Sequence, residues 1–141
     1  MKSSLRKLIE QGENQTLDFK YCISDSRKIA RTLSAFANSD GGKLLIGVKD
    51  NGKIAGVQSE EEYYMIENAA HLFCSPEIPF TIKRHRFGDM EILEVDVAEG
   101  ANKPYRVKDE NGIWKSYFRH NDQNLGANRI MVLLYLFLLI N

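Results

Sequence analysis

The chain has 141 residues, of which 43% are hydrophobic and 10% aromatic, and this length corresponds to a single folded domain rather than a disordered segment. Its 19 basic and 19 acidic side chains give no net charge, which argues against a uniformly basic nucleic-acid binder. The charges are unevenly distributed, however. Residues 1–59 carry ten basic and six acidic side chains, residues 60–77 carry five glutamates and no lysine or arginine, and residues 78–141 carry nine basic and eight acidic side chains. A neutral total is therefore compatible with a locally basic surface.

The N-terminal segment predicts a helix, a strand and a second helix. An amphipathic run that ends at Gly12 indicates a short first helix. Residues 16–21 alternate between apolar and polar side chains, which is typical of a half-buried strand and directs Asp18 and Lys20 away from the core. Apolar residues at helical spacing then predict a core helix that Asp25 or the serine after it caps.

The middle of the chain predicts a hairpin and a third helix. The apolar residues 43–48 form a strand, and Asn51-Gly52 is a turn signal that leads into a second short strand at 53–57. Ser59 and Glu62 have the spacing of a capping box, which predicts a helix to about Cys74.

The second half consists mainly of strands. Residues 80–87 and 90–97 flank a Gly-Asp turn, residues 105–107 are extended after a proline, and residues 113–118 form a last strand. We therefore expect an α/β (α+β) fold with a mixed sheet of hairpins packed against about three helices.

The C-terminal residues are unusually apolar. Residues 130–140 are all hydrophobic, which is too short for a helix that crosses a membrane, so we expect no membrane association. A helix that is apolar on every side has to be buried, either in its own domain or against a partner. We divide the chain into a domain of residues 1–125 and an apolar helix or tail of residues 126–141, and expect a homo-oligomer that forms through this tail.

Cys22 and Cys74 lie far apart in the sequence and belong to no Cys-x-x-Cys motif. We expect two reduced, buried thiols and a cytoplasmic location.

Three groups of residues, in this order, resemble the motifs of the Schlafen-type AlbA domain: Glu13-Asn14-Gln15-Thr16-Leu17-Asp18-Phe19-Lys20, then Ala35-Phe36-Ala37-Asn38 with Gly41-Gly42, then Leu45-Ile46-Gly47-Val48-Lys49-Asp50 with Gly52 and Gly56. The resemblance extends from about Leu8 to Arg119. It implies a nucleic-acid-binding fold, which occurs at the N-terminus of many bacterial regulators and in the nuclease core of animal Schlafen proteins.

The same resemblance implies a candidate catalytic and metal-binding set. In the animal relatives, carboxylates at the positions that match Glu13, Asp18 and Asp50 form a metal-dependent ribonuclease site, and oxygen ligands of this kind suit Mg²⁺ or Mn²⁺. The nuclease members have glutamate where this chain has Asp18, and one methylene less withdraws the carboxylate by roughly 1.5 Å. Simpler roles stay open, because Asp18 could pair with Lys20 and Asp50 could begin a turn.

Basic residues near aromatic ones indicate a surface for phosphates and bases. The candidate phosphate contacts are Lys20, Lys83, Arg84, Arg86, Lys103, Arg106 and Arg119. Trp114 and Phe118 lie close to several of them in the sequence, although both could instead belong to the core and the charges to a solvated strand edge.

The leading hypothesis is a non-catalytic domain that binds DNA or RNA, as the DNA-binding part of a transcriptional regulator, with no cofactor. There is no Gly-x-x-x-x-Gly-Lys-Ser/Thr sequence, so we expect no ATP hydrolysis. The alternatives are a Mg²⁺- or Mn²⁺-dependent endoribonuclease that uses the three carboxylates, and a protein-interaction module that self-associates through its tail.

Overall fold

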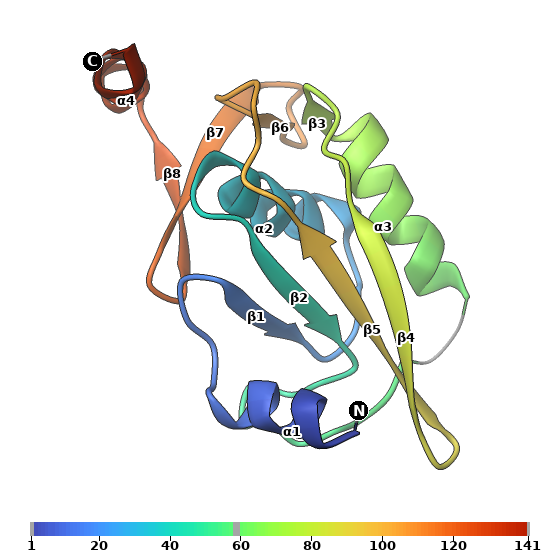
Figure 1. The fold of residues 1–141 in the computed structure, drawn as a ribbon. Coiled ribbons are helices and arrows are strands. Elements are labelled where there is room, and N and C mark those ends of the chain that lie inside the picture. The colour runs from blue at the N-terminus through green and yellow to red at the C-terminus, as the bar shows by residue number, and fades with distance from the viewer. Residues whose placement is uncertain (1, 58–59, 141) are drawn as a thin grey trace.

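In the computed structural model, the described residues 2–57 and 60–140 form two four-stranded sheets and four helices (Figure 1). The helices are α1 (Lys2–Glu10), α2 (Ser26–Asn38), α3 (Glu61–Leu72) and α4 (Arg129–Ile140). The strands are β1 (Leu17–Lys20), β2 (Gly42–Ile46), β3 (Cys74–Ser75), β4 (Thr81–Phe87), β5 (Met90–Val97), β6 (Arg106–Lys108), β7 (Trp114–His120) and β8 (Gln123–Ala127). This mixture of helices and strands confirms the predicted fold class.

The first sheet has the strand order β1-β2-β5-β4. Strands β1 and β2 are parallel, because α2 connects them and returns the chain to the same end of the sheet, whereas the other pairs are antiparallel. Leu44 and Ile46 of β2 belong to the core that α2 and α3 cover. Leu17 and Phe19 of β1 belong to a second core on the opposite face, which α1 covers. Both faces of this sheet are therefore buried near β1.

The prediction that Asp18 faces away from the core is wrong, since this residue is only 2% exposed. Alternation along β1 does separate Asp18 and Lys20 from their apolar neighbours, but the face they occupy lies beneath α2 and β7. A strand with both faces covered has no solvated side, so Asp18 is enclosed, while Lys20 is half-buried.

The second sheet has the strand order β3-β6-β7-β8 and is antiparallel throughout. Helix α2 lies between the two sheets (Figure 1) and contacts strands of both. Asn38, at the end of α2, connects this helix to the second sheet through side-chain hydrogen bonds. Its Nδ2 donates to the carbonyls of Tyr105 (2.9 Å) and Tyr117 (2.8 Å), and its Oδ1 accepts from the Tyr105 N–H (2.6 Å).

Asp25 caps α2 as predicted, because its side chain accepts a hydrogen bond from the Arg27 N–H. The predicted second strand at 53–57 is wrong, because only an isolated bridge joins Val48 to Ile54. The loop folds back instead at Gly47, whose φ is +100° and where a Cβ would lie 2.9 Å from the backbone of the facing loop.

The boundaries of α3 and of the second sheet also depart from the predictions. The predicted cap of α3, Ser59, lies outside the described residues, and Glu60 before the helix makes no capping hydrogen bond with its side chain. Cys74 belongs to β3 rather than to the helix, and β8 was not predicted at all.

Figure 1 shows α4 at the end of β8, set apart from the rest of the fold. Its side chains are largely exposed, for example Phe137 at 62% and Ile140 at 84%, so the domain itself does not bury them. None of the helices in the described ranges has the length and hydrophobicity that a membrane span requires.

The prediction of two buried thiols holds for Cys74 only, since Cys22 is exposed.

Candidate nucleic-acid interface

The open edge of β1 is occupied by side chains that the sequence analysis assigned to catalysis or phosphate binding. Arg119 Nη2 donates to the carbonyls of Leu17 (2.9 Å) and Asn14 (2.9 Å), and its Nε donates to Asn14 as well (3.2 Å). Glu13 Oε2 accepts a hydrogen bond from the Phe19 N–H at 3.0 Å. Glu13 thus satisfies an N–H of the edge strand, and Arg119 adds further hydrogen bonds to two carbonyls that also accept from each other's backbone N–H.

Arg119 also forms a buried ion pair with Asp18. The distance from Nη2 to Oδ1 is 3.4 Å, and the two side chains are only 1% and 3% exposed. The guanidinium lies 5.1 Å from the centre of the Phe36 ring, and its Nη1 donates to Asn124 Oδ1 at 2.8 Å. The prediction that Arg119 contacts phosphate is therefore at odds with its position, because its donors are directed to groups inside the protein.

The three candidate carboxylates do influence one another. The pKa of Glu13 is raised to about 7, chiefly by burial and in addition by the hydrogen bond to Asp18 and the negative charges of Asp18 and Asp50, while the hydrogen bond from the Phe19 N–H opposes the rise. Asp18 Oδ2 is buried without a hydrogen-bond partner, and Lys20 Nζ lies 3.5 Å from it. A protonated Glu13 could supply the missing donor, which explains why the raised pKa of Glu13 is tied to Asp18.

The arrangement does not fit the divalent metal ion that the family resemblance implies. Within residues 2–57 and 60–140, no group of three or more His, Cys, Asp or Glu side chains is arranged to hold a metal ion. Asp18 is already engaged by Arg119 and Lys20, and Glu13 accepts a backbone N–H. Asp18 and Asp50 therefore influence the pKa of Glu13, but Asp18 and Glu13 are already engaged by other groups and are not free to act as metal ligands.

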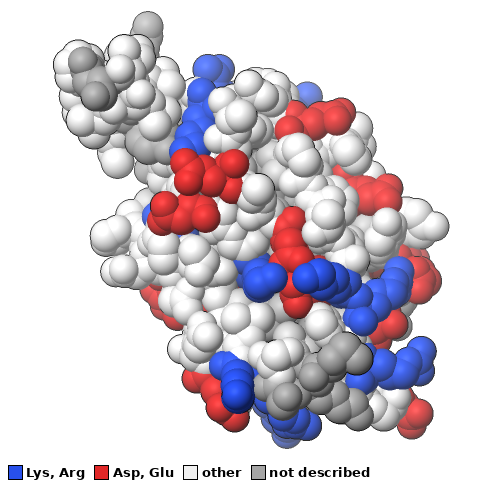
Figure 2. All heavy atoms as spheres, viewed as in Figure 1, with Lys and Arg blue, Asp and Glu red and all other residues white. Residues whose placement is uncertain are grey.

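Two of the three candidate cations on β4 face acidic partners. Lys83 lies 3.7 Å from Glu94 and 3.6 Å from Asp96, and Arg84 lies 2.7 Å from Glu91 and 3.2 Å from Glu60. Figure 2 shows the consequence, because basic and acidic side chains alternate over the face formed by β2, β5 and β4. Lys83 and Arg84 are thus neutralised by acidic side chains of β5 and of the residue before α3, which the local sequence does not reveal.

Glu94 is the centre of this mixed-charge cluster. It accepts from Lys43 Nζ (2.9 Å) and contacts His85 Nε2 (2.9 Å). Burial alone would raise the pKa of Glu94, but hydrogen bonds that involve Lys43, Asp96 and His85 outweigh it and hold this pKa at about 2. The cluster therefore keeps a carboxylate charged on a face where several cations were predicted to meet phosphates.

The remaining candidates differ in how available they are. The Lys103 side chain is only 8% exposed and pairs with Glu99. Arg86 and Arg106 are exposed and form no ion pair with any described residue. Lys83, Arg84 and Lys103 stay predictions as phosphate contacts, each with an acidic competitor beside it.

A separate groove is lined by cations of β1 and α2 and by polar and apolar residues of β8. It has a volume of about 430 Å³ and lies where β1, α2 and β8 meet. We call it the basic groove, and its lining residues are Lys20, Lys28, Arg31, Thr32, Gln123, Asn124 and Leu125. Of these residues, only Lys20 was predicted as a phosphate contact. The spacing of Lys28 and Arg31 on one side of an amphipathic helix is the sequence signal for the other two cations.

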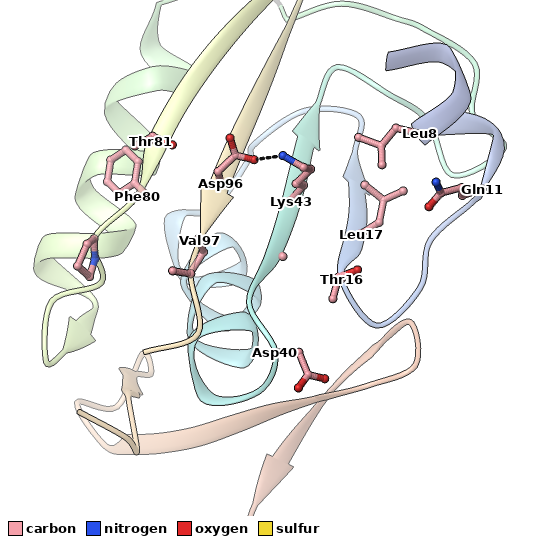
Figure 3. Close-up of a pocket in the computed structure, with 13 residues that line it drawn as sticks. Leu8, Gln11, Thr16, Leu17, Asp40, Lys43, Phe80, Thr81, Asp96 and Val97 are labelled. Atoms are coloured by element: carbon pink, nitrogen blue, oxygen red, sulfur yellow. Dashed lines mark hydrogen bonds and ion pairs between the residues drawn. The ribbon is translucent and has the colours of Figure 1, made fainter. Parts of the chain in front are cut away.

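Another hollow, of about 560 Å³, lies on the opposite side of the first sheet, between α1 and β4. Figure 3 shows Leu8 and Leu17 on one side of it, Phe80 and Thr81 on the other, and the ion pair of Lys43 with Asp96 (2.7 Å) between them. Because its one lining cation is paired with a carboxylate, this hollow is a poor candidate for a polyanion.

Comparisons with known proteins agree with the fold. Among solved structures, the chain is similar to a Corynebacterium diphtheriae protein, with 20% identity and a TM-score of 0.59 over 86% of this chain and 23% of that one. It is also similar to the N-terminal domain of an ATP-dependent DNA helicase RecG-related protein from Nitrosomonas europaea, with 21% identity and a TM-score of 0.57 over 89% of this chain and 90% of that one.

At these identities the likeness concerns the fold alone, and the chain spans less than a quarter of the C. diphtheriae protein. A search of curated proteins gave no match. The family model described as "Schlafen, AlbA_2" matches residues 13–128, which include the carboxylates, Asn38 and the whole of the basic groove. The chain is therefore a member of the Schlafen AlbA_2 family.

Proposed function

We propose that this domain binds nucleic acid through the basic groove, as the DNA-binding part of a transcriptional regulator in the cytoplasm. The observation that carries the proposal is the composition of the groove, whose lining includes three cations and no carboxylate. The family supports a nucleic-acid partner, and DNA is the partner we favour because the N. europaea relative is described by its relation to a DNA helicase.

The chemistry of the groove suits a phosphate backbone. Lys28 is exposed and forms no ion pair with any described residue, so its ammonium group is available. The Arg31 guanidinium lies 5.9 Å from the centre of the Tyr117 ring, which orients it without neutralising it. The amide group of Gln123 can donate to phosphate or sugar oxygens, as such side chains commonly do in complexes with DNA, whereas the Asn124 amide is held by Arg119 and Thr32. No cofactor is needed for this function.

The test is a titration of labelled single- and double-stranded DNA and RNA at two salt concentrations, followed by fluorescence anisotropy. We expect the charge reversal Lys28→Glu to weaken binding about tenfold and to reduce the slope of log affinity against log salt by about 1. The matched control is Lys83→Glu, which removes a cation that Glu94 and Asp96 already neutralise. Equal effects of the two variants, or no binding to any of the four nucleic acids at low salt, would overturn the proposal.

A metal-dependent ribonuclease is the second candidate, and the mutual influence of Glu13, Asp18 and Asp50 favours it. The engagement of Asp18 with Arg119 weighs against it. A cleavage assay on structured RNA with Mn²⁺ separates the two. The non-catalytic proposal expects the wild type to leave the RNA as intact as Asp50→Ala does, whereas cleavage by the wild type alone would establish the nuclease.

We further propose that the chain self-associates through α4, with a second copy of the chain as the partner. Seven large apolar side chains of this helix are between 48% and 84% exposed: Met131, Leu133, Leu134, Phe137, Leu138, Leu139 and Ile140. At roughly 200 Å² for a fully exposed large apolar side chain, they present on the order of 800 Å², the area that each partner contributes to a typical stable interface. The helix has no acidic residue and its one charged residue is Arg129 at the start, so nothing in it selects a charged partner.

Sedimentation of the full chain tests self-association. We expect a dimer or larger species that dissociates in the variant Leu134→Lys/Leu138→Lys, because burial of two ammonium groups in an apolar interface is unfavourable. A monomeric wild type at micromolar concentration, or a variant that associates equally well, would overturn this proposal.

A further inference from the structure

A second concave site lies on the second sheet, away from the mixed-charge face. It has a volume of about 420 Å³ and is formed by β3, β6, β7 and the loop before β6. We call it the tryptophan pocket, and its lining residues are Ser75, Pro76, Asn102, Pro104, Arg106 and Trp114. None of them is acidic, and the lining contains an indole ring, two proline rings, a guanidinium and two small polar side chains.

The aromatic residue of this pocket is open to solvent. Trp114 is 41% exposed, although a tryptophan that served only the core would be covered. It is the only tryptophan of the chain. An indole that is partly exposed beside two prolines offers a flat apolar surface on which a planar ring can stack.

Two cations flank the indole. Exposed and buried side chains alternate along β6: Val107 is only 2% exposed, whereas Arg106 and Lys108 on either side of it are exposed. Both cations are therefore on the same outer face. Lys108 is the cross-strand partner of Trp114, and Arg106 lies two positions along the same strand. In antiparallel sheets, side chains in these positions are within reach of one another. Neither cation forms an ion pair with a described residue, in contrast to Lys83 and Arg84 of β4.

From this arrangement we infer that the tryptophan pocket binds an unpaired base of single-stranded nucleic acid. The base stacks on Trp114, Arg106 and Lys108 contact the adjoining phosphates, and the side chains of Asn102 and Ser75 are placed to form hydrogen bonds with the base edge. A base inside a duplex cannot present its flat face to a side chain, so the pocket selects single strands. The absence of carboxylates from the lining favours a polyanion over a proline-rich peptide as the ligand.

This inference rests on the proposed function and deepens it. The basic groove supplies phosphate contacts that single and double strands share, whereas the tryptophan pocket adds a contact that only unpaired bases can make. The domain should therefore prefer single strands over a duplex of equal charge, and this preference should depend on Trp114.

Because the chain has one tryptophan, its own fluorescence reports on the pocket. We titrate the full chain at low salt with a short oligothymidylate and, separately, with a blunt-ended duplex, and follow both tryptophan emission and the anisotropy of a labelled oligonucleotide. The expected result is quenching by the single strand and little change with the duplex. Trp114→Ala should weaken single-strand binding at least tenfold and leave duplex binding unchanged. Trp114→Phe, which keeps a ring, should retain most of the affinity.

Two controls make the outcome decisive. Circular dichroism of Trp114→Ala shows whether the fold is intact, and Arg106→Ala, which leaves the indole in place, should weaken single-strand binding without abolishing quenching. If single strands bind without quenching, and with equal affinity in Trp114→Ala, the inference that the tryptophan pocket binds a base is overturned, while the basic groove remains the proposed nucleic-acid site. Failure of every nucleic acid to bind at low salt would overturn both proposals together.

Discussion

Replacement of Arg119 by methionine tests whether this guanidinium is a structural group rather than a phosphate contact. Methionine keeps an unbranched apolar chain that can still contact Phe36, but it donates no hydrogen bond. The variant therefore removes the interactions that join β7 to the edge of β1 and leaves most of the side-chain volume in place.

The magnitude follows from the groups that lose their partner. The carbonyls of Asn14 and Leu17 and the amide of Asn124 each lose a hydrogen bond, with a net contribution of about 1 kcal/mol apiece. Asp18, whose side chain is only 3% exposed, loses one of its two cations and keeps Lys20 at 3.5 Å, and removal of one partner from a buried ion pair costs about 3–5 kcal/mol. Because these costs overlap, we expect the free energy of unfolding to fall by about 4 kcal/mol, a large share of the 5–15 kcal/mol typical of a domain.

Urea unfolding followed by circular dichroism measures this loss. The matched control is Arg86→Met, which removes the same charge from an exposed position and should change the free energy of unfolding by less than about 0.5 kcal/mol. Adding Asp18→Asn to Arg119→Met should recover part of the stability, because the buried charge is then gone. A loss below about 1 kcal/mol in Arg119→Met, with no recovery in the double variant, would refute the structural role.

Three further predictions concern stability. Glu13 has a pKa of about 7 in the folded state and of 4.5 ordinarily, so the native state loses stability as the pH rises from 4.5 to 7. We expect a loss of about 1 kcal/mol between pH 5 and pH 8, after allowance for the partial exposure of Glu13, and Glu13→Gln should abolish this loss when unfolding is measured at both pH values. Asn38→Leu should cost about 3 kcal/mol in chemical denaturation, because two carbonyls and an N–H lose buried partners; a cost near zero would show that water replaces the amide. Gly41→Ala should lower stability by more than about 2 kcal/mol, because φ is +76° and a Cβ would lie 2.8 Å from the Val97 carbonyl oxygen. Gly88→Ala, where φ is +59° and nothing lies within 4 Å, is its thermal-unfolding control and should cost clearly less.

Local features of the fold could be predicted from the sequence because they depend on neighbouring residues. The period of apolar side chains predicted α1, α2 and the hairpin of β4 and β5, and the cap at Asp25 is formed by a backbone N–H two residues away. The 53–57 strand was predicted from the same kind of pattern and is wrong, because the close approach of the loop to Gly47 depends on the path of the chain as a whole. Strand β8 was not predicted because it is short and polar, and because it is stabilised by pairing with β7 rather than by a pattern of its own.

The candidate site was only partly predictable for the same reason. The resemblance pointed to Glu13, Asp18 and Asp50, and the negative charges of the two aspartates contribute to the raised pKa of Glu13. Nothing local indicated that Arg119 would lie 3.4 Å from Asp18, since 101 positions separate the two in the sequence.

The sequence by itself determined the family, the class of fold and the positions of most helices and strands, because periodicity, caps and turn residues act over a few positions. The tertiary structure decided which charges are available. Cross-strand register places Glu94 and Asp96 against Lys83, packing on both faces of the first sheet buries Asp18, and the meeting of β1, α2 and β8 creates the basic groove. The electrostatic interaction of two side chains depends on their distance and burial, and both are set by contacts between residues far apart in the chain.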